Sequence, residues 1–131
     1  MKRLLVLALF LVMGVAATSC TDSTNPSDSL AGTYSLRSVN GSSLPVTICP
    51  QSSPCYQVLS AEISLDTYGN YQSISRYSDG NESATGTWSL SGNQLTLIDS
   101  FDGYASTATV SGSSLAFTNL SGSTYSAVYT K

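Results

Sequence analysis

The sequence contains no histidine and few basic side chains. Its 131 residues include five lysines and arginines in total, against eight aspartates and glutamates. Without histidine the chain has no Ser-His-Asp or Cys-His catalytic system and no histidine ligand for a metal. The scarcity of lysine and arginine rules out the basic patch that nucleic-acid binding requires.

A nucleophilic hydrolase motif is also missing, because no serine lies in a Gly-x-Ser-x-Gly sequence. We therefore expect a protein without catalytic residues, bound metal or cofactor. One enzymatic alternative remains, a hydrolase in which two of the acidic side chains converge in a cleft.

Long apolar runs are absent except at the N-terminus. There, Lys2 and Arg3 precede an apolar run over residues 4–17, and small residues then lead to Cys20. A membrane-spanning helix needs about 20 apolar residues, so this run is too short to cross a membrane stably. A basic start, an apolar centre and a small-residue exit are typical of a secretory signal peptide. We predict that residues 1–19 direct export and are then removed.

The residues Ala17, Thr18 and Ser19 before Cys20 resemble the lipobox of bacterial lipoproteins, in which small residues precede a lipidated cysteine. The resemblance implies that Cys20 carries a lipid and holds the protein in the cell envelope, at the outer membrane in a Gram-negative cell. The alternative is ordinary secretion, with cleavage near Ala17 and a free Cys20. The acidic balance argues against electrostatic docking to an anionic membrane, so the lipid would be the attachment.

The other two of the three cysteines, Cys49 and Cys55, lie close together in the chain. An oxidising compartment favours a disulfide between them. Their spacing matches neither the usual zinc knuckle nor the C-x-x-C motif of redox sites. Their pairing would leave Cys20 as the odd cysteine, which supports its lipidation.

The chain that follows alternates between strand patterns and turn residues. Residues 20–29 are polar and are predicted to be a flexible tether, and residues 30–131 are predicted to form one domain. Turns are expected at Asn40-Gly41 and Asp79-Gly80-Asn81, because glycine and asparagine tolerate the positive φ of tight hairpins. Strands are predicted over residues 33–39, 56–65, 71–77, 84–90, 94–98, 104–110, 114–120 and 124–130.

Strands joined by such short loops predict an antiparallel all-β fold. An open meander would expose two edges, and closure into a barrel removes them. We therefore predict a small eight-stranded up-and-down barrel, closed by pairing of the first and last strands. A two-sheet β-sandwich is the alternative, because alternation of apolar and polar residues occurs in both architectures.

The stretch Leu30-Ala31-Gly32-Thr33-Tyr34-Ser35-Leu36, followed by Val39-Asn40-Gly41 and Leu44-Pro45, resembles the start of a lipocalin-like domain of bacterial lipoproteins. Gly86-Thr87-Trp88 and the closing segment from Tyr125 to Tyr129 are compatible with such a domain. The resemblance implies an eight-stranded barrel whose interior or mouth holds a small, partly apolar ligand.

Aromatic side chains occur on most predicted strands and would line such a ligand site. The same side chains could instead fill the core, since an eight-stranded barrel is wide enough for either arrangement. Two arginines would orient an anionic group of the ligand, or would lie on the outer face paired with acidic side chains. The candidate ligand-binding residues are Tyr34, Tyr71, Trp88, Tyr104, Tyr125, Arg37 and Arg76.

These features predict a non-catalytic module that binds a small ligand in the cell envelope. The alternative is a structural or protein-interaction domain with a fully packed barrel and no ligand. An interior cavity on the order of a few hundred Å3 would favour the first function. A solid core with an exposed aromatic patch would favour the second.

Overall fold

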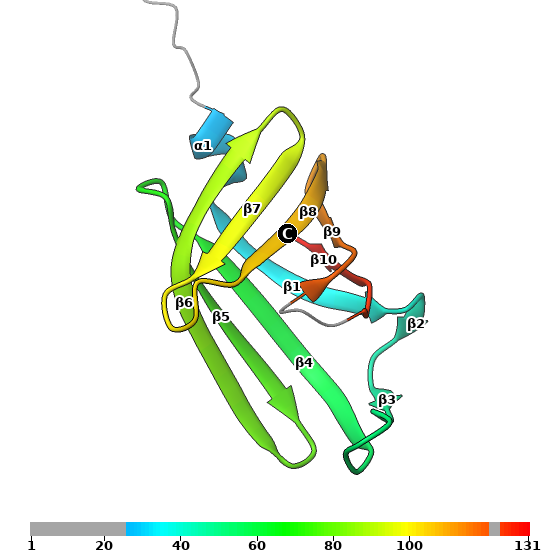
Figure 1. Cartoon of the computed structure of the whole chain (residues 1–131). Coiled ribbons are helices and arrows are strands. Elements are labelled where there is room, and N and C mark those ends of the chain that lie inside the picture. Colours follow the sequence, from blue (N-terminus) through cyan, green and yellow to red (C-terminus); the bar gives the residue numbers. More distant parts are fainter. Residues whose placement is uncertain (1–25, 121–123) are drawn as a thin grey trace, which may run out of the picture.

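The computed structural model of the chain describes residues 26–120 and 124–131. The predicted signal peptide, Cys20 and the first part of the predicted tether lie outside these ranges. Figure 1 shows a barrel of strands with a short helix near one end. In the described part of the chain, no helix has the length and apolar character needed to span a membrane.

The described elements follow one another with short connections. A single helical turn, α1 (Pro26–Leu30), comes first. The strands are β1 (Gly32–Val39), β2 (Ser42–Ser43), β3 (Val46–Ile48), β4 (Tyr56–Leu65), β5 (Asn70–Tyr77), β6 (Gly80–Ser91), β7 (Gln94–Asp99), β8 (Ala105–Ser111), β9 (Ser114–Phe117) and β10 (Ala127–Thr130).

Backbone pairing closes these strands into a barrel. From β4 to β10, each strand pairs antiparallel with the next one in the chain. β10 then pairs with β1, and residues 32–35 of β1 also pair with β4. The short strand β2 pairs with β1, and the short strand β3 pairs with β4. The predicted eight-stranded antiparallel barrel is therefore confirmed, and the sandwich alternative is wrong because all strands belong to one sheet.

Alternation along each strand directs every second side chain into the barrel. β4 adds a register shift between Val58 and Ser60, so that Val58 and Ala61 are both buried although they are three residues apart. Such a bulge bends the strand and strengthens its twist, which helps a small barrel to close. Buried side chains from all eight long strands form the core: Tyr34, Ile63, Tyr71, Trp88, Leu95, Ala108, Leu115 and Tyr129.

The turns agree with the sequence at one hairpin and differ at another. Asn40 and Gly41 both have positive φ, 49° and 78°, as predicted for the turn between β1 and β2. The turn expected at Asp79-Gly80-Asn81 is instead a loop of Ser78 and Asp79, because Gly80 already pairs with Tyr77 as the first residue of β6. The β5–β6 hairpin is therefore longer than expected.

The predicted strands over 114–120 and 124–130 are shorter in the structure. β9 ends at Phe117, because the next residues, Thr118 and Asn119, are polar and exposed and leave the sheet. β10 begins at Ala127, opposite Phe117 in the register of the two strands.

Side chains from the N-terminal and the C-terminal part of the domain hold α1 against the barrel. Leu30 is buried in the core, and the Tyr34 hydroxyl donates a hydrogen bond of 2.7 Å to the backbone oxygen of Leu30. The Lys131 ammonium donates to the backbone oxygens of Ser29 and Ala31. It also lies 5.5 Å from the centre of the Tyr34 ring. α1 is thereby tied to the barrel.

The helical turn differs from the flexible tether expected up to residue 29. Proline at the first helical position and Asp28 in the first turn both favour a helix start. Residues 26–29 consequently belong to the folded domain.

The close contact at Gly86 gives a test of the packing between β5, β6 and β7. A Cβ at Gly86 would overlap the backbone oxygen of Ile98 and lie 2.7 Å from Cε1 of Tyr71. We expect Gly86→Ala to lower the free energy of unfolding by about 2 kcal/mol or more, because a backbone oxygen cannot move aside easily. Urea denaturation would measure this loss. Thr85→Ala, at the exposed neighbouring position, is the control and should change stability far less.

Candidate functional site

A cavity of about 590 Å3 occupies part of the barrel interior. Apolar, buried side chains from several strands form part of its lining: Leu36, Val39, Ile48, Val58, Ile63 and Leu97. Leu30 and Tyr34, which pack at the α1 end, do not line it. The cavity thus lies toward the other end of the barrel, where the β5–β6 hairpin projects in Figure 1.

Hydroxyl and carboxylate groups line the rest of the cavity. Its hydroxyl-bearing residues are Tyr56, Tyr71, Tyr77, Tyr125, Tyr129, Ser73, Ser75, Ser83 and Ser106. Its acidic residues are Glu82, Asp99 and Asp102. Glu82, Ser83 and Asp102 are exposed, so they mark the side on which the cavity meets solvent. Within the described residues, no group of three or more cysteine and acidic side chains is arranged to hold a metal ion.

Alternation along β5 explains much of this lining. Tyr71, Ser73, Ser75 and Tyr77 are every second residue of the strand, and all four line the cavity. The neighbouring strand β6 places Glu82 beside Ser75 in the sheet register. Serines are small, so this part of the wall leaves space that leucine or phenylalanine would fill.

Tyr56 and Tyr77 form an aromatic corner beside Glu82. Their ring centres are 5.4 Å apart and the rings are nearly perpendicular, at 86°. Burial raises the pKa of both hydroxyls, and the nearby Glu82 carboxylate raises them further. The two phenols are therefore neutral at neutral pH and can donate or accept hydrogen bonds.

A third tyrosine, Tyr71, lies near the other two carboxylates, Asp99 and Asp102. Gly86 pairs with Tyr71 on one side and with Asp99 on the other, and the Tyr71 ring passes close over the glycine. Burial raises the pKa of Tyr71, and the carboxylates of Asp99 and Asp102 raise it further. The absence of a side chain at Gly86 therefore lets a phenol lie next to an acidic position.

The turn between β7 and β8 fixes these two carboxylates. Oδ1 of Asp99 accepts a hydrogen bond of 2.6 Å from the backbone N–H of Phe101. Oδ1 of Asp102 accepts one of 2.8 Å from the backbone N–H of Tyr104. Aspartate commonly stabilises a turn in this way, two residues before the donor. Both side chains are thus held by local backbone geometry.

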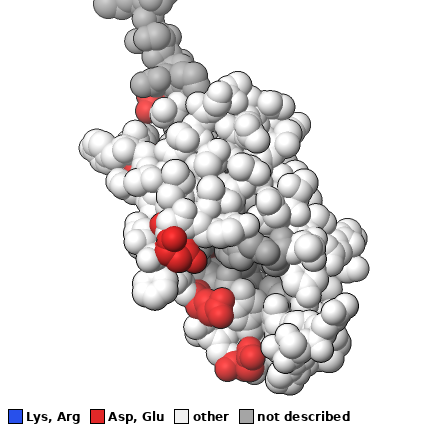
Figure 2. All heavy atoms as spheres, in the orientation of Figure 1, with Lys and Arg blue, Asp and Glu red and all other residues white. Residues whose placement is uncertain are grey.

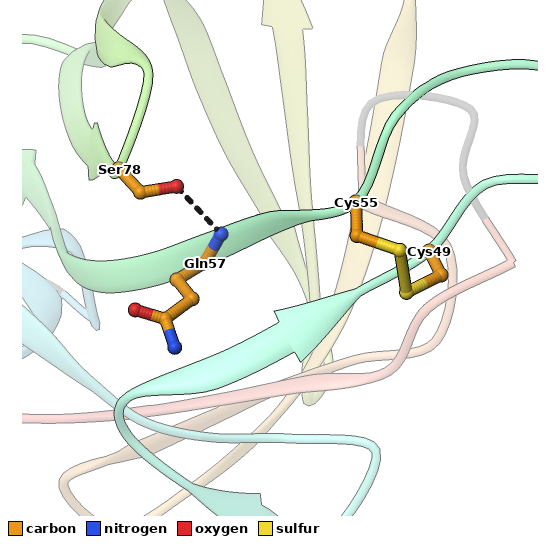
Figure 3. The surroundings of a disulfide bond; sticks show 4 residues. All are labelled: Cys49, Cys55, Gln57 and Ser78. Carbon is orange, nitrogen blue, oxygen red and sulfur yellow. Dashed lines mark hydrogen bonds between the residues drawn. A yellow bond between two sulfur atoms is a disulfide. The ribbon is translucent and has the colours of Figure 1, made fainter.

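A disulfide constrains another part of the cavity wall. Cys49 and Cys55 are bonded to each other, as predicted, and close the loop between β3 and β4 (Figure 3). Ile48 and Tyr56, the residues on either side of this loop, both line the cavity. Closing so short a loop stabilises the fold by about 2 kcal/mol in the chain-entropy view.

The same region is tied to the β5–β6 hairpin. The backbone N–H of Gln57 donates a hydrogen bond of 2.9 Å to Oγ of Ser78, as Figure 3 shows. The backbone N–H of Ser78 donates one of the same length, 2.9 Å, to the oxygen of Gln57. These bonds place Tyr56 and Tyr77 beside each other.

Two of the seven predicted ligand-binding residues line the cavity, namely Tyr71 and Tyr125. The other three aromatic candidates lie elsewhere. Tyr34 is buried against α1, and the indole N–H of Trp88 donates a hydrogen bond of 3.0 Å to the backbone oxygen of Asp66. Tyr104 is 42% exposed in the β7–β8 turn.

The two arginine candidates lie on the outer face. Arg37 and Arg76 are exposed, and Nε of Arg37 donates a hydrogen bond of 2.7 Å to Oγ1 of Thr130. Arg37 directly follows the inward-facing Leu36, and Arg76 directly precedes the inward-facing Tyr77. Alternation along the strands therefore turns both arginines away from the cavity.

The sequence reasoning missed the carboxylates and several hydroxyl groups of the cavity. The period-2 pattern of Tyr71, Ser73, Ser75 and Tyr77 was a usable signal for the inner face of β5. Glu82 lies on β6 because this strand begins at Gly80, whereas the sequence predicted a turn at Asp79-Gly80-Asn81 and a strand only from residue 84.

Residues 30–117, well over half of the chain, match the family of lipocalin-like domains. The chain belongs to the lipocalin-like domain family. It is also similar to the crystal structure of a lipocalin-like protein from Bacteroides uniformis, at 21% identity and a TM-score of 0.48, over 79% of this chain and 98% of that one. No curated protein matches the chain significantly.

Because tyrosine hydroxyls are buried in this lipocalin-like domain, we expect its free energy of unfolding to fall at alkaline pH. Burial raises the pKa of Tyr129 far above its ordinary value, so above about pH 10 the folded state keeps a proton that the unfolded chain loses. The free energy of unfolding should then fall as pH rises, by up to ~1.4 kcal/mol per pH unit for each such tyrosine.

Urea denaturation from about pH 8 to about pH 11 would measure this dependence in the wild type and in Tyr129→Phe. The variant should lose stability less steeply. Tyr68→Phe is the control, since Tyr68 is 90% exposed. Equal slopes for all three proteins would contradict the assignment to Tyr129.

Proposed function

We propose that this lipocalin-like protein is a lipid-anchored component of the bacterial cell envelope that binds a small, partly apolar ligand inside its barrel. The cavity is the observation that supports ligand binding most strongly. Its volume of about 590 Å3 lies within the range of roughly 300–1,000 Å3 that small-molecule sites have. The buried apolar side chains and the hydroxyl groups of the lining suit a ligand with an apolar body and a polar group.

The alternative of a fully packed structural domain has less support. A packed barrel of this size fills its interior with side chains. Here the small residues Ala61, Ser73 and Ala84 face the cavity. The most exposed aromatic side chains, Tyr68 and Phe101, belong to two different turns and do not come from one strand face.

The envelope location rests on the N-terminal sequence. The basic start, the short apolar run and the small residues before Cys20 support export and lipidation. The Cys49–Cys55 disulfide is also consistent with an oxidising compartment outside the cytoplasm. Cys20 would then be joined to the domain by the few residues before α1.

A bulky side chain inside the cavity tests ligand binding. Ala84 lines the cavity and is only partly buried, so Ala84→Trp should fill the space without overlapping the core. Native mass spectrometry of protein exported by its own host should show a bound small molecule on the wild type. The variant should lose it, or bind it at least about tenfold more weakly, because the site is occupied.

Ala105→Trp is the matched control, since Ala105 is exposed on β8 and does not line the cavity. It should keep the bound molecule. A wild type that carries no small molecule and binds none from a host lipid extract would contradict the proposed function.

Lipidation is tested separately by labelling cells with a fatty-acid analogue. The wild-type protein should incorporate the label and fractionate with membranes, and Cys20→Ser should not incorporate it. Cys49→Ser, which leaves Cys20 in place, should still be labelled. Label in the Cys20→Ser protein, or an unmodified N-terminus in the wild type, would show that the lipobox interpretation is wrong.

A further inference from the structure

The fixed charges of the cavity lining have one sign. Apart from its tyrosines, the titratable lining residues are Glu82, Asp99 and Asp102. The basic side chains that the structure describes point elsewhere, with Arg37 and Arg76 exposed on the outer face and Lys131 bonded at the α1 end. Figure 2 shows acidic side chains and no basic one on the described part of this face. The opening of the cavity is therefore a region of negative potential.

The corner formed by Tyr56, Tyr77 and Glu82 has the composition of a cation site. The two rings meet edge to face, with centres 5.4 Å apart and planes at 86°, and both residues line the cavity. The face of an aromatic ring attracts an ammonium group, and a desolvated site strengthens this attraction. The Glu82 carboxylate, close enough to both phenols to raise their pKa, supplies the opposite charge.

The other two carboxylates are at a separate position. Asp99 is opposite Gly86 in the sheet, four residues along β6 from Glu82, which corresponds to about 13 Å along an extended strand. Tyr71 lies beside them. The cavity thus has two acidic positions, each with a tyrosine partner, and Ser73, Ser75 and Ala84 line the wall between them.

We infer that the ligand is an organic cation, an amphiphilic amine or ammonium compound. Its charged group lies beside Tyr56, Tyr77 and Glu82, and its apolar body extends over the buried side chains of Val58 and Ile63. Anions such as fatty acids are disfavoured, because no basic side chain of the described lining would neutralise a carboxylate. This inference rests on the proposed ligand-binding function and adds the sign of the ligand's charge.

Three eight-carbon probes with different head groups test the inference. Native mass spectrometry of the exported protein, titrated with octylamine, octanol and octanoate, would measure the three affinities under the same conditions. We expect octylamine to bind about tenfold more tightly than octanol, and octanoate to bind most weakly. Octylamine and octanol carry the same alkyl chain, so the difference between these two reports on the charge alone, whereas the chain of octanoate is one methylene shorter.

Glu82→Gln should weaken octylamine binding about fivefold and leave octanol binding unchanged. Glu62→Gln, on the exposed face of β4, is the matched control and should bind all three probes as the wild type does.

Octanol binding with no preference for the amine, or a preference for octanoate, would overturn the cationic ligand and leave the proposed function intact. If Glu82→Gln lowered the affinities for octylamine and octanol equally, the assignment of the charged group to this corner would be overturned. Failure of every probe, together with no co-purifying molecule, would instead count against ligand binding itself.

Discussion

The fold depends on the double pairing of β1. Its first residues, from Gly32 to Ser35, pair with β4, and the rest of the strand pairs with β10. One strand therefore joins both ends of the meander, and neither β4 nor β10 is left as a long exposed edge. Closure also decides which residues meet. Alternation turns one face of every strand inward, so residues as distant in the chain as Tyr56 and Tyr129 line the same volume.

The two ends of the barrel are packed differently. Toward α1, large buried side chains such as Tyr34, Trp88 and Leu95 fill the interior, and Lys131 ties α1 to the barrel. Toward the β5–β6 hairpin, serine and alanine replace large side chains, and a cavity remains. The packed end can stabilise the domain while the open end stays available for a ligand. The Cys49–Cys55 disulfide and the Gln57–Ser78 hydrogen bonds compensate for weaker packing around the opening.

The fold was largely predictable from sequence, and the site was not. Strand positions follow from local alternation and from turn residues, so the span 56–65 was predicted with the bounds that the structure has. The choice of a barrel followed from the number of strands and the short loops. Site residues depend on the phase of each strand and on register across the sheet. Arg37 and Arg76 were assigned to the ligand on residue type, although alternation places them outside. Glu82 was missed because the sequence predicted a strand only from residue 84, whereas β6 begins at Gly80.

The central claim is that the barrel is hollow and holds a ligand at its open end. A crystal structure of the protein purified from its own host tests this claim most directly. We predict electron density for a bound molecule between Tyr77, Tyr125 and Ala84, with the side chains of β5 and β6 placed as they are here. An interior filled by inward movement of Leu120, Tyr125 and their neighbours, with no space left for a ligand, would contradict the account.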